Sequence, residues 1–237
     1  MSPFARRLLM GLLLVAAIGF ARLGVWQLHR LRERQAANLL TTAARNAPPV
    51  LLPPTLVGAD SLREHRVVAR GRYDHAREII VRGDVLQGVP GVRLVTPLLL
   101  RPEGPAVLVD RGFLPAPDAV TVDTRGSEEP GDLEVRGIAL LVPPGPAELM
   151  NHAGRVTWRR LDLATIRSRL PYAVLPIYIR QTPDSVLPRF PRRLAPSPID
   201  EGPHLAYAIQ WFLFAALAAA FALLVVGKRA PTQDSER

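Results

Sequence analysis

The chain of 237 residues contains no cysteine. This absence excludes disulfides, iron–sulfur clusters, thiolate zinc or copper sites and a cysteine nucleophile. Aromatic residues make up only 6% of the chain, and lysine occurs once, as Lys228, among 30 basic residues. The formal net charge is +9, which is typical of nucleic-acid-binding proteins. The arginines, however, are scattered and alternate with Asp and Glu, so we expect no nucleic-acid partner.

Motifs of the common enzyme classes are also missing. The chain has no G-x-S-x-G elbow, no Walker loop and no H-E-x-x-H zinc motif. Gly83, Gly88 and Gly91 lie close together without a following Lys-Ser/Thr pair, which favours turns over a phosphate-binding loop. No two histidines are three or four residues apart, and only His65 and His75 flank the same expected strand. We therefore expect a protein that is not an enzyme.

Long hydrophobic runs stand at both ends of the chain. Residues 203–227 contain no charged side chain and are long enough to cross a bilayer as a helix. Residues 8–28 form a weaker run that is interrupted by Arg22, whose long side chain can reach the membrane interface. We expect an uncleaved transmembrane helix there. The alternative is a cleaved signal peptide with a poor cleavage site at residues 17–19.

The short tails predict the orientation of these two spans. Arg6 and Arg7 lie in residues 1–7, and the tail at 228–237 contains Lys228, Arg229 and Arg237. The positive-inside rule counts such short segments and discounts long translocated domains. We therefore expect a multi-pass protein of a bacterial inner membrane, with both termini cytoplasmic and residues 29–202 forming a periplasmic domain.

The segment between the spans is rich in proline and glycine. All prolines except Pro3 and Pro231 lie within residues 48–203. We expect the first helix to continue to residue 47, followed by a proline-rich linker at 48–58. Short strands are then expected at Arg66–Tyr73, Glu78–Arg82, Arg93–Leu100, Ala106–Arg111, Leu133–Leu141 and Val174–Gln181, with one helix at Asp162–Leu170.

Two connections complete the predicted β domain. Residues 74–77 suggest a hairpin between the first two strands, and residues 117–132 suggest an exposed loop. The predicted fold class is an α+β membrane protein, in which two transmembrane helices flank an exported, mainly antiparallel and partly closed β domain.

His204 stands at the start of the second span. Tyr207, Ala208, Trp211 and Ala215 share its helical face, and Ala218 and Ala222 continue it. One interpretation is an axial ligand for haem iron, with the macrocycle against Tyr207 and Trp211. The alternative is an interfacial aromatic belt beside an ordinary polar residue.

A second group of residues ends the first span. Trp26 and Arg30 are one helical turn apart, with Gln27 beside them. If the two spans pair antiparallel, this group lies at the same end as His204. The planar guanidinium of Arg30 is then suited to an anionic group such as a haem propionate. An aromatic belt followed by a solvated basic helix is again the alternative.

Six segments, in this order, resemble the motifs of the Surfeit locus protein 1 family, which assembles haem–copper cytochrome c oxidase. They are Leu23–Arg30 (LGVWQLHR), Arg70–Asp74 with Glu78–Arg82, Val95–Leu98 (VTPL), Val107–Pro115 (VLVDRGFLP), Trp158 with Asp162, and His204–Phe212 (HLAYAIQWF). Each segment alone is weak evidence for the resemblance, but the six segments in this order cover nearly the whole chain and are specific to the family.

The resemblance implies two spans around an exported β-rich domain and a role in supplying haem a to oxidase subunit I. It implies His204 as the haem ligand, lined by Trp26, Arg30, Tyr207 and Trp211, with subunit I, haem a synthase and the lipid bilayer as partners. The family usually has Asn or Glu shortly before this histidine, whereas this chain has Gly202-Pro203. A partner that orients the imidazole is therefore expected to be missing.

Two other functions remain open at this point. The first is a membrane-anchored scaffold that stabilises an oxidase intermediate without binding haem. Arg111-Gly112-Phe113 would then be either one contact region or a buried turn. The second is a membrane-tethered hydrolase or receptor, for which no pair of nucleophile and base is visible.

Overall fold

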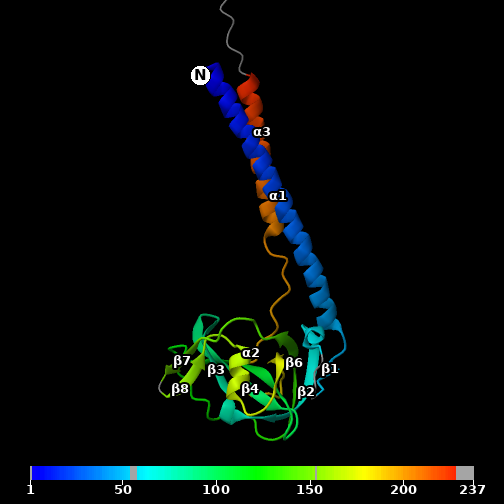
Figure 1. Cartoon of the computed structure of the whole chain (residues 1–237), viewed down its shortest axis with the longest axis vertical. Helices are drawn as coiled ribbons and strands as arrows, with labels where there is room; N and C mark the ends of the chain where they lie inside the picture. The colour runs from blue at the N-terminus through cyan, green and yellow to red at the C-terminus, as the bar shows by residue number, and fades with distance from the viewer. Residues whose placement is uncertain (1, 54–57, 153, 228–237) are drawn as a thin grey trace, which may run out of the picture. The chain divides into compact units, whose positions relative to one another are not determined.

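The computed structural model describes residues 2–53, 58–152 and 154–227 (Figure 1). The chain divides into a helical unit, Met1–Leu40 with Ile199–Arg237, and a β unit, Thr41–Pro198. The predicted tail at 228–237 lies outside the described residues.

The helical unit consists of two long helices that lie side by side (Figure 1). Helix α1 spans Pro3–Asn46 and helix α3 spans His204–Gly227, so the prediction that the first helix continues to just before Pro48 is confirmed. Both are long and apolar enough to cross a membrane, because each contains an 18-residue stretch with a mean hydropathy of 2.2. Only 6% of the apolar window of α1 and 17% of that of α3 are buried, whereas the core helix of a soluble protein is mostly buried.

The β unit is built on one sheet of nine strands within the described residues. Its order is β1-β2-β6-β9-β5-β4-β3-β8-β7. An additional pairing of β2 with β4 closes the strands β2, β6, β9, β5 and β4 into a barrel. Six pairings are antiparallel, while β1–β2, β5–β9 and β3–β8 are parallel. The strand bounds are β1 Val50–Leu51, β2 Arg66–Tyr73, β3 Ile79–Leu86, β4 Val89–Leu99, β5 Ala106–Pro115, β6 Leu133–Leu141, β7 Leu149–His152, β8 Arg155–Trp158 and β9 Val174–Gln181.

Among the described residues, three short helices accompany the sheet: η1 (Ala59–Leu62), η2 (His75–Arg77) and α2 (Leu163–Arg169). The prediction of a helix at Asp162–Leu170 is confirmed, because Asp162 and Leu170 are the two caps of α2. The carboxylate of Asp162 accepts hydrogen bonds from the hydroxyl and the backbone N–H of Thr165, and these bonds lower the pKa of Asp162. Such an N-cap satisfies a backbone donor that the helix itself leaves free.

The predicted hairpin at residues 74–77 is wrong. These residues contain η2, and strand β4 lies between β2 and β3, because Tyr73 pairs with Leu98 of β4 while Ile79 pairs with Val95 of the same strand. The hairpin is instead formed by β3 and β4, around Gln87 and Gly88, which both have positive φ angles of 53° and 81°. Two-residue hairpins favour this conformation, so the turn-forming interpretation of Gly88 is confirmed.

The exposed loop at residues 117–132 is only partly as predicted. Most of it is exposed, but Ser127 is buried and the side chain of Glu129 turns inward, with 10% of it exposed. Glu129 forms ion pairs there with Arg111, at 2.7 Å, and with Arg193. The loop therefore brings a carboxylate to two guanidinium groups that are almost fully buried.

Arg111 is the centre of this buried charge cluster, and its side chain is 0% exposed. It donates to the Glu78 carboxylate at 3.0 Å and lies 5.0 Å above the ring of Tyr73, and Thr96 also donates to Glu78. Burial raises the pKa of Tyr73. Arg111, Gly112 and Phe113 are therefore buried in β5, so they are not an exposed contact region for a partner.

Candidate functional site

The predicted site residues lie on the two helices of the helical unit. Helix α3 begins at His204, where the carbonyl oxygen of Pro203 accepts the N–H of Tyr207 at 3.0 Å. Just before it, Gly202 has a positive φ of 73°, and its N–H donates to the Asp200 carboxylate at 2.8 Å. This turn sets the start of α3 and with it the position of the imidazole.

Gln27 is the residue of α1 that contacts His204. Its side-chain oxygen Oε1 lies 2.9 Å from Nδ1 of the imidazole, in a hydrogen bond between residues 177 positions apart in the chain. The expectation that His204 has no orienting partner is therefore wrong. The partner comes from the other helix and not from the residues that precede His204.

Further hydrogen bonds join α1 to the segment before α3. Arg34 and Asn38 donate to the carbonyl oxygen of Asp200 at 3.1 and 3.0 Å, and Gln35 donates to the Glu201 carboxylate at 3.2 Å. All of them lie within the helical unit. They tie the connection that leads into α3 to the polar part of α1.

Tyr207 and Trp211 have different environments. Tyr207 is 47% exposed. The ring of Trp211 stacks on that of Phe20, with a centroid distance of 5.7 Å and an angle of 25°, and meets the edge of Phe214 at 5.9 Å. Such aromatic contacts favour a fixed packing of α3 on α1. Sequence reasoning missed Phe20, because no sequence signal pairs it with Trp211.

The small residues of α3 do not form an open groove. Ala208, Ala218 and Ala222 are 1%, 7% and 2% exposed. Gly24 and Leu31 are the buried residues of α1. A Cβ added at Gly24 would lie 2.8 Å from the Phe212 ring, so this glycine makes room for an α3 side chain. The alanines therefore line the contact between the helices.

Trp26 and Arg30 do not contact His204 by any interaction that the structure records. Trp26 is 53% exposed and borders a shallow groove of about 640 Å³, lined by Ala16, Gly19, Phe20, Arg22, Leu23 and Trp26. Arg30 pairs with Glu33 at 2.8 Å, and both side chains are largely exposed. Arg22 has no recorded hydrogen bond or ion pair within the described residues. An unpaired charge in an apolar span is typical of functional sites.

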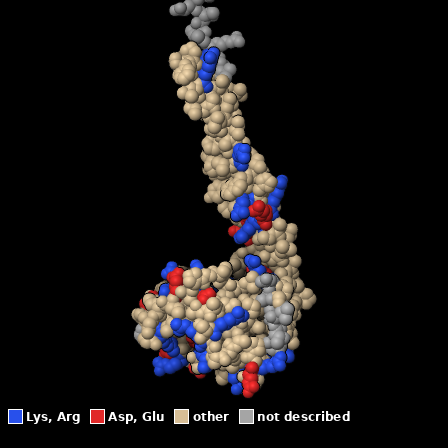
Figure 2. Space-filling view, in the orientation of Figure 1, with Lys and Arg blue, Asp and Glu red and all other residues tan. Residues whose placement is uncertain are grey.

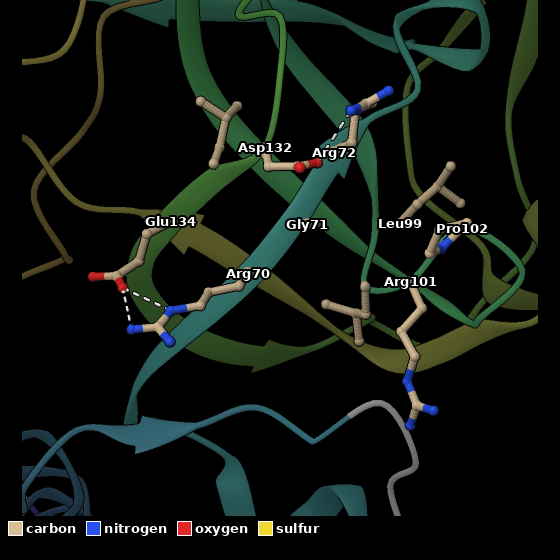
Figure 3. A pocket seen from close by; sticks show the side chains of 10 residues that line it. Arg70, Gly71, Arg72, Leu99, Arg101, Pro102, Asp132 and Glu134 are labelled. Carbon is tan, nitrogen blue, oxygen red and sulfur yellow. Dashed lines mark hydrogen bonds and ion pairs between the residues drawn. The ribbon is translucent and has the colours of Figure 1, made fainter.

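The β unit has a separate open pocket of about 790 Å³ between the ends of β2, β4 and β6 (Figure 3). Figure 3 shows Arg70 paired with Glu134 at 2.9 Å and Arg72 paired with Asp132 at 3.4 Å, while Arg101 extends away from both pairs. The described residues that line the pocket include neither serine nor histidine. The hydrolase hypothesis therefore gains no pair of nucleophile and base from it.

The histidines and carboxylates of the described residues are not gathered into a metal-binding cluster. No group of three His, Asp or Glu side chains is placed to hold a metal ion there. His65 and His75 lie at opposite ends of β2, and His75 instead contacts Tyr73 and the backbone of Glu129. Figure 2 shows arginines scattered over the β unit with carboxylates among them.

Comparison with known proteins gives a consistent family. A model of the SURF1 family matches residues 14–216. The chain is similar to a SURF1-like protein of Monosiga brevicollis, with 27% identity over 88% of this chain and 84% of that protein, and to Surfeit locus protein 1 of Takifugu rubripes, with 26% identity over 85% and 89%. It is also similar to the cytochrome oxidase assembly protein SHY1 of Saccharomyces cerevisiae, with 23% identity over 67% of this chain and 40% of that protein.

Proposed function

The chain belongs to the SURF1 family, and on that premise we propose that it assists the assembly of haem–copper cytochrome c oxidase by binding haem a and delivering it to subunit I. The name of the yeast relative supports the assembly role. Haem a is cargo in this proposal, so the protein acts as a haem chaperone and catalyses no reaction.

The observation that carries the haem proposal is the His204 imidazole, held at the start of α3 by a residue of α1 at 2.9 Å. A neutral imidazole is a common axial ligand of haem iron. About two turns further along the helix pair begins a cluster of aromatic rings formed by Phe20, Trp211 and Phe214. An apolar macrocycle favours such surroundings.

The groove beside Trp26 supports the same proposal. Phe20 both lines this shallow groove and stacks on Trp211, so the groove adjoins the aromatic contact between α1 and α3. Arg22 at the groove and Arg30 one turn beyond Trp26 are suited to the propionate groups, since guanidinium binds carboxylate through two parallel hydrogen bonds. Trp26, Arg30, Tyr207 and Trp211 line the proposed site, and His204 ligates the iron.

The proposal includes a location. The exposed apolar residues of α1 and α3 favour a bilayer around both helices, and Arg6 and Arg7 favour a cytoplasmic N-terminus by the positive-inside rule. We infer a bacterial inner-membrane protein with a periplasmic β unit. The His204 end of the helix pair then faces the outer leaflet, where haem a synthase and subunit I are the proposed partners.

The test is to express the chain in cells that make haem a and to record the absorption spectrum of the purified protein. We expect haem a in the wild type and its loss in His204→Ala. His29→Ala is the matched control, because His29 is an exposed histidine of α1 at the same end of the helical unit. Equal haem in wild type and His204→Ala would exclude His204 as the essential ligand. Absence of haem from all three proteins would favour the scaffold function.

A further inference from the structure

We propose that Gln27 is a positioning residue that fixes the His204 imidazole as the Nδ1–H tautomer and leaves Nε2 as the atom that binds iron. This inference rests on the proposed haem function. It starts from the 2.9 Å contact between Gln27 Oε1 and His204 Nδ1, which joins α1 to α3.

The chemistry of the two groups determines the tautomer. An amide oxygen accepts hydrogen bonds and cannot donate them, so the imidazole nitrogen that faces it must carry the proton. A neutral imidazole has only one N–H, and the lone pair is then on Nε2. Histidines that bind metals usually donate their second nitrogen to such an acceptor, which fixes the ring orientation and raises the basicity of the ligand atom.

The position of Gln27 on α1 explains why this bond persists. Gly24 and Leu31, the two buried residues of α1, are three residues before and four residues after Gln27, so all three share one helical face. That face packs on α3, since a Cβ at Gly24 would meet the Phe212 ring. The bond is thus at the contact between the helices, where water competes less than at an exposed surface.

The residue next to the other side of the ring is Gly202. A Cβ added there would lie 3.6 Å from Nε2 and 3.5 Å from the neighbouring ring carbon Cδ2. The positive φ of Gly202, 73°, also favours glycine over other residues. The absence of a side chain leaves room beside the nitrogen that the tautomer makes available, so the Gly202-Pro203 sequence is compatible with a ligand histidine.

An amide partner also suits a protein that must release its cargo. A neutral amide oxygen is a weaker acceptor than a carboxylate, whose charge would strengthen the bond and the ligand. We therefore expect Gln27→Leu to weaken haem a binding by roughly 10–100-fold, the usual effect of losing a partner of a ligand histidine. The Gln27→Glu variant should instead bind ferric haem a more tightly than the wild type does, because a carboxylate strengthens the ligand. The reduction potential of the bound haem should fall accordingly.

The experiment uses the full chain in lipid nanodiscs and two readouts. The first is the ¹⁵N spectrum of the haem-free protein labelled at histidine, with the His204 signals assigned by their loss in His204→Ala. We expect Nδ1 to be protonated in the wild type and a mixture of tautomers in Gln27→Leu. The second readout is haem a affinity and reduction potential. Gln35→Leu is the matched control, because Gln35 also bonds from α1 to the segment before α3, at Glu201.

Each outcome distinguishes this inference from the proposed function. Unchanged tautomer, affinity and potential in Gln27→Leu would overturn the positioning role while the haem function stands. A wild type that binds no haem a would overturn both the haem function and the ligand role of Nε2, even if Nδ1 is protonated. Equal losses in Gln27→Leu and Gln35→Leu would show a general effect of helix pairing and would also overturn the inference.

Discussion

Replacement of Glu129 by Gln tests the buried charge cluster of the β unit. Glu129 forms ion pairs with Arg111 and with Arg193, whose side chains are 0% and 2% exposed. Arg111 retains Glu78 at 3.0 Å in the variant. Arg193 retains only the neutral side chain of Gln181, at 2.9 Å, and backbone carbonyl groups. Of the two buried guanidinium groups, only that of Arg111 then keeps a carboxylate partner.

The expected loss follows from the cost of a buried charge without its partner. Breaking a buried ion pair on one side costs about 3–5 kcal/mol, since the remaining charge stays away from water. With a typical urea dependence of roughly 2 kcal/mol per M, the unfolding midpoint should fall by about 1.5–2.5 M. Removal of an exposed pair has little effect. Glu148→Gln is the matched control, because Glu148 lies 3.7 Å from Arg159 and both side chains are more than half exposed.

The assay is urea unfolding of the full chain in detergent micelles, followed by the fluorescence of Trp158 in a background in which Trp26 and Trp211 are both replaced by Phe. Trp158 is 5% exposed and belongs to the β unit, so its emission reports on that unit. A midpoint for Glu129→Gln no lower than that of Glu148→Gln would refute the reasoning, because the cluster would then not depend on its second carboxylate.

Two further predictions concern the β unit. Gly112→Ala should destabilise it by about 1–3 kcal/mol more than Gly83→Ala, because a Cβ at Gly112 would lie 2.2 Å from the backbone oxygen of Arg192, whereas nothing lies within 4 Å of one at Gly83. Both glycines have positive φ angles, so the difference in unfolding free energy isolates the clash, and equal losses would contradict it. The N-terminus of helix α2 should also be destabilised in acid, because the pKa of Asp162 is lower in the folded protein than in the unfolded chain. The Asp162 cap therefore stabilises the fold fully above the ordinary Asp pKa, near 3.9, and this contribution is lost as the pH falls through the lowered pKa. The measurement is hydrogen exchange of the Thr165 backbone N–H, with each rate divided by the intrinsic exchange rate at that pH. Its protection should fall in this pH window in the wild type but not in Asp162→Asn.

The strands that sequence reasoning predicted best are three of the five that form the barrel. The bounds of β2, β6 and β9 agree with the prediction at both ends. Strands β7 and β8 were missed, since each has four residues and β7 ends in Asn151-His152. Strands β7 and β8 pair with each other, and β8 also pairs with β3, where Ile80 and its partner Thr157 are 77 positions apart, so no local pattern shows these strands.

The charge cluster shows a similar limit. Tyr73, Glu78, Thr96 and Arg111 all lie in segments that resemble the family motifs, yet their common role follows only from the barrel, which brings them together. Glu129 was missed because it lies in a segment whose composition is typical of a solvated loop.

The two long helices of the helical unit were predicted, and the contact of His204 with Gln27 was not. Composition alone located the two apolar helices, and spacing placed His204, Tyr207 and Trp211 on one stretch of α3. Which residue of α1 meets the imidazole depends on how two helices rotate against each other, and one-residue neighbours point about 100° apart. Gln27 therefore could not be chosen over Trp26 from the sequence.

The most direct test of the central claim is the haem a content of subunit I in oxidase purified from cells that lack the chromosomal copy of this protein. Plasmid-borne wild type and His29→Ala should restore haem a in subunit I. His204→Ala, expressed and inserted at the same level, should leave subunit I depleted of haem a. Full haem a content with His204→Ala would contradict the claim that His204 holds the haem that reaches the oxidase.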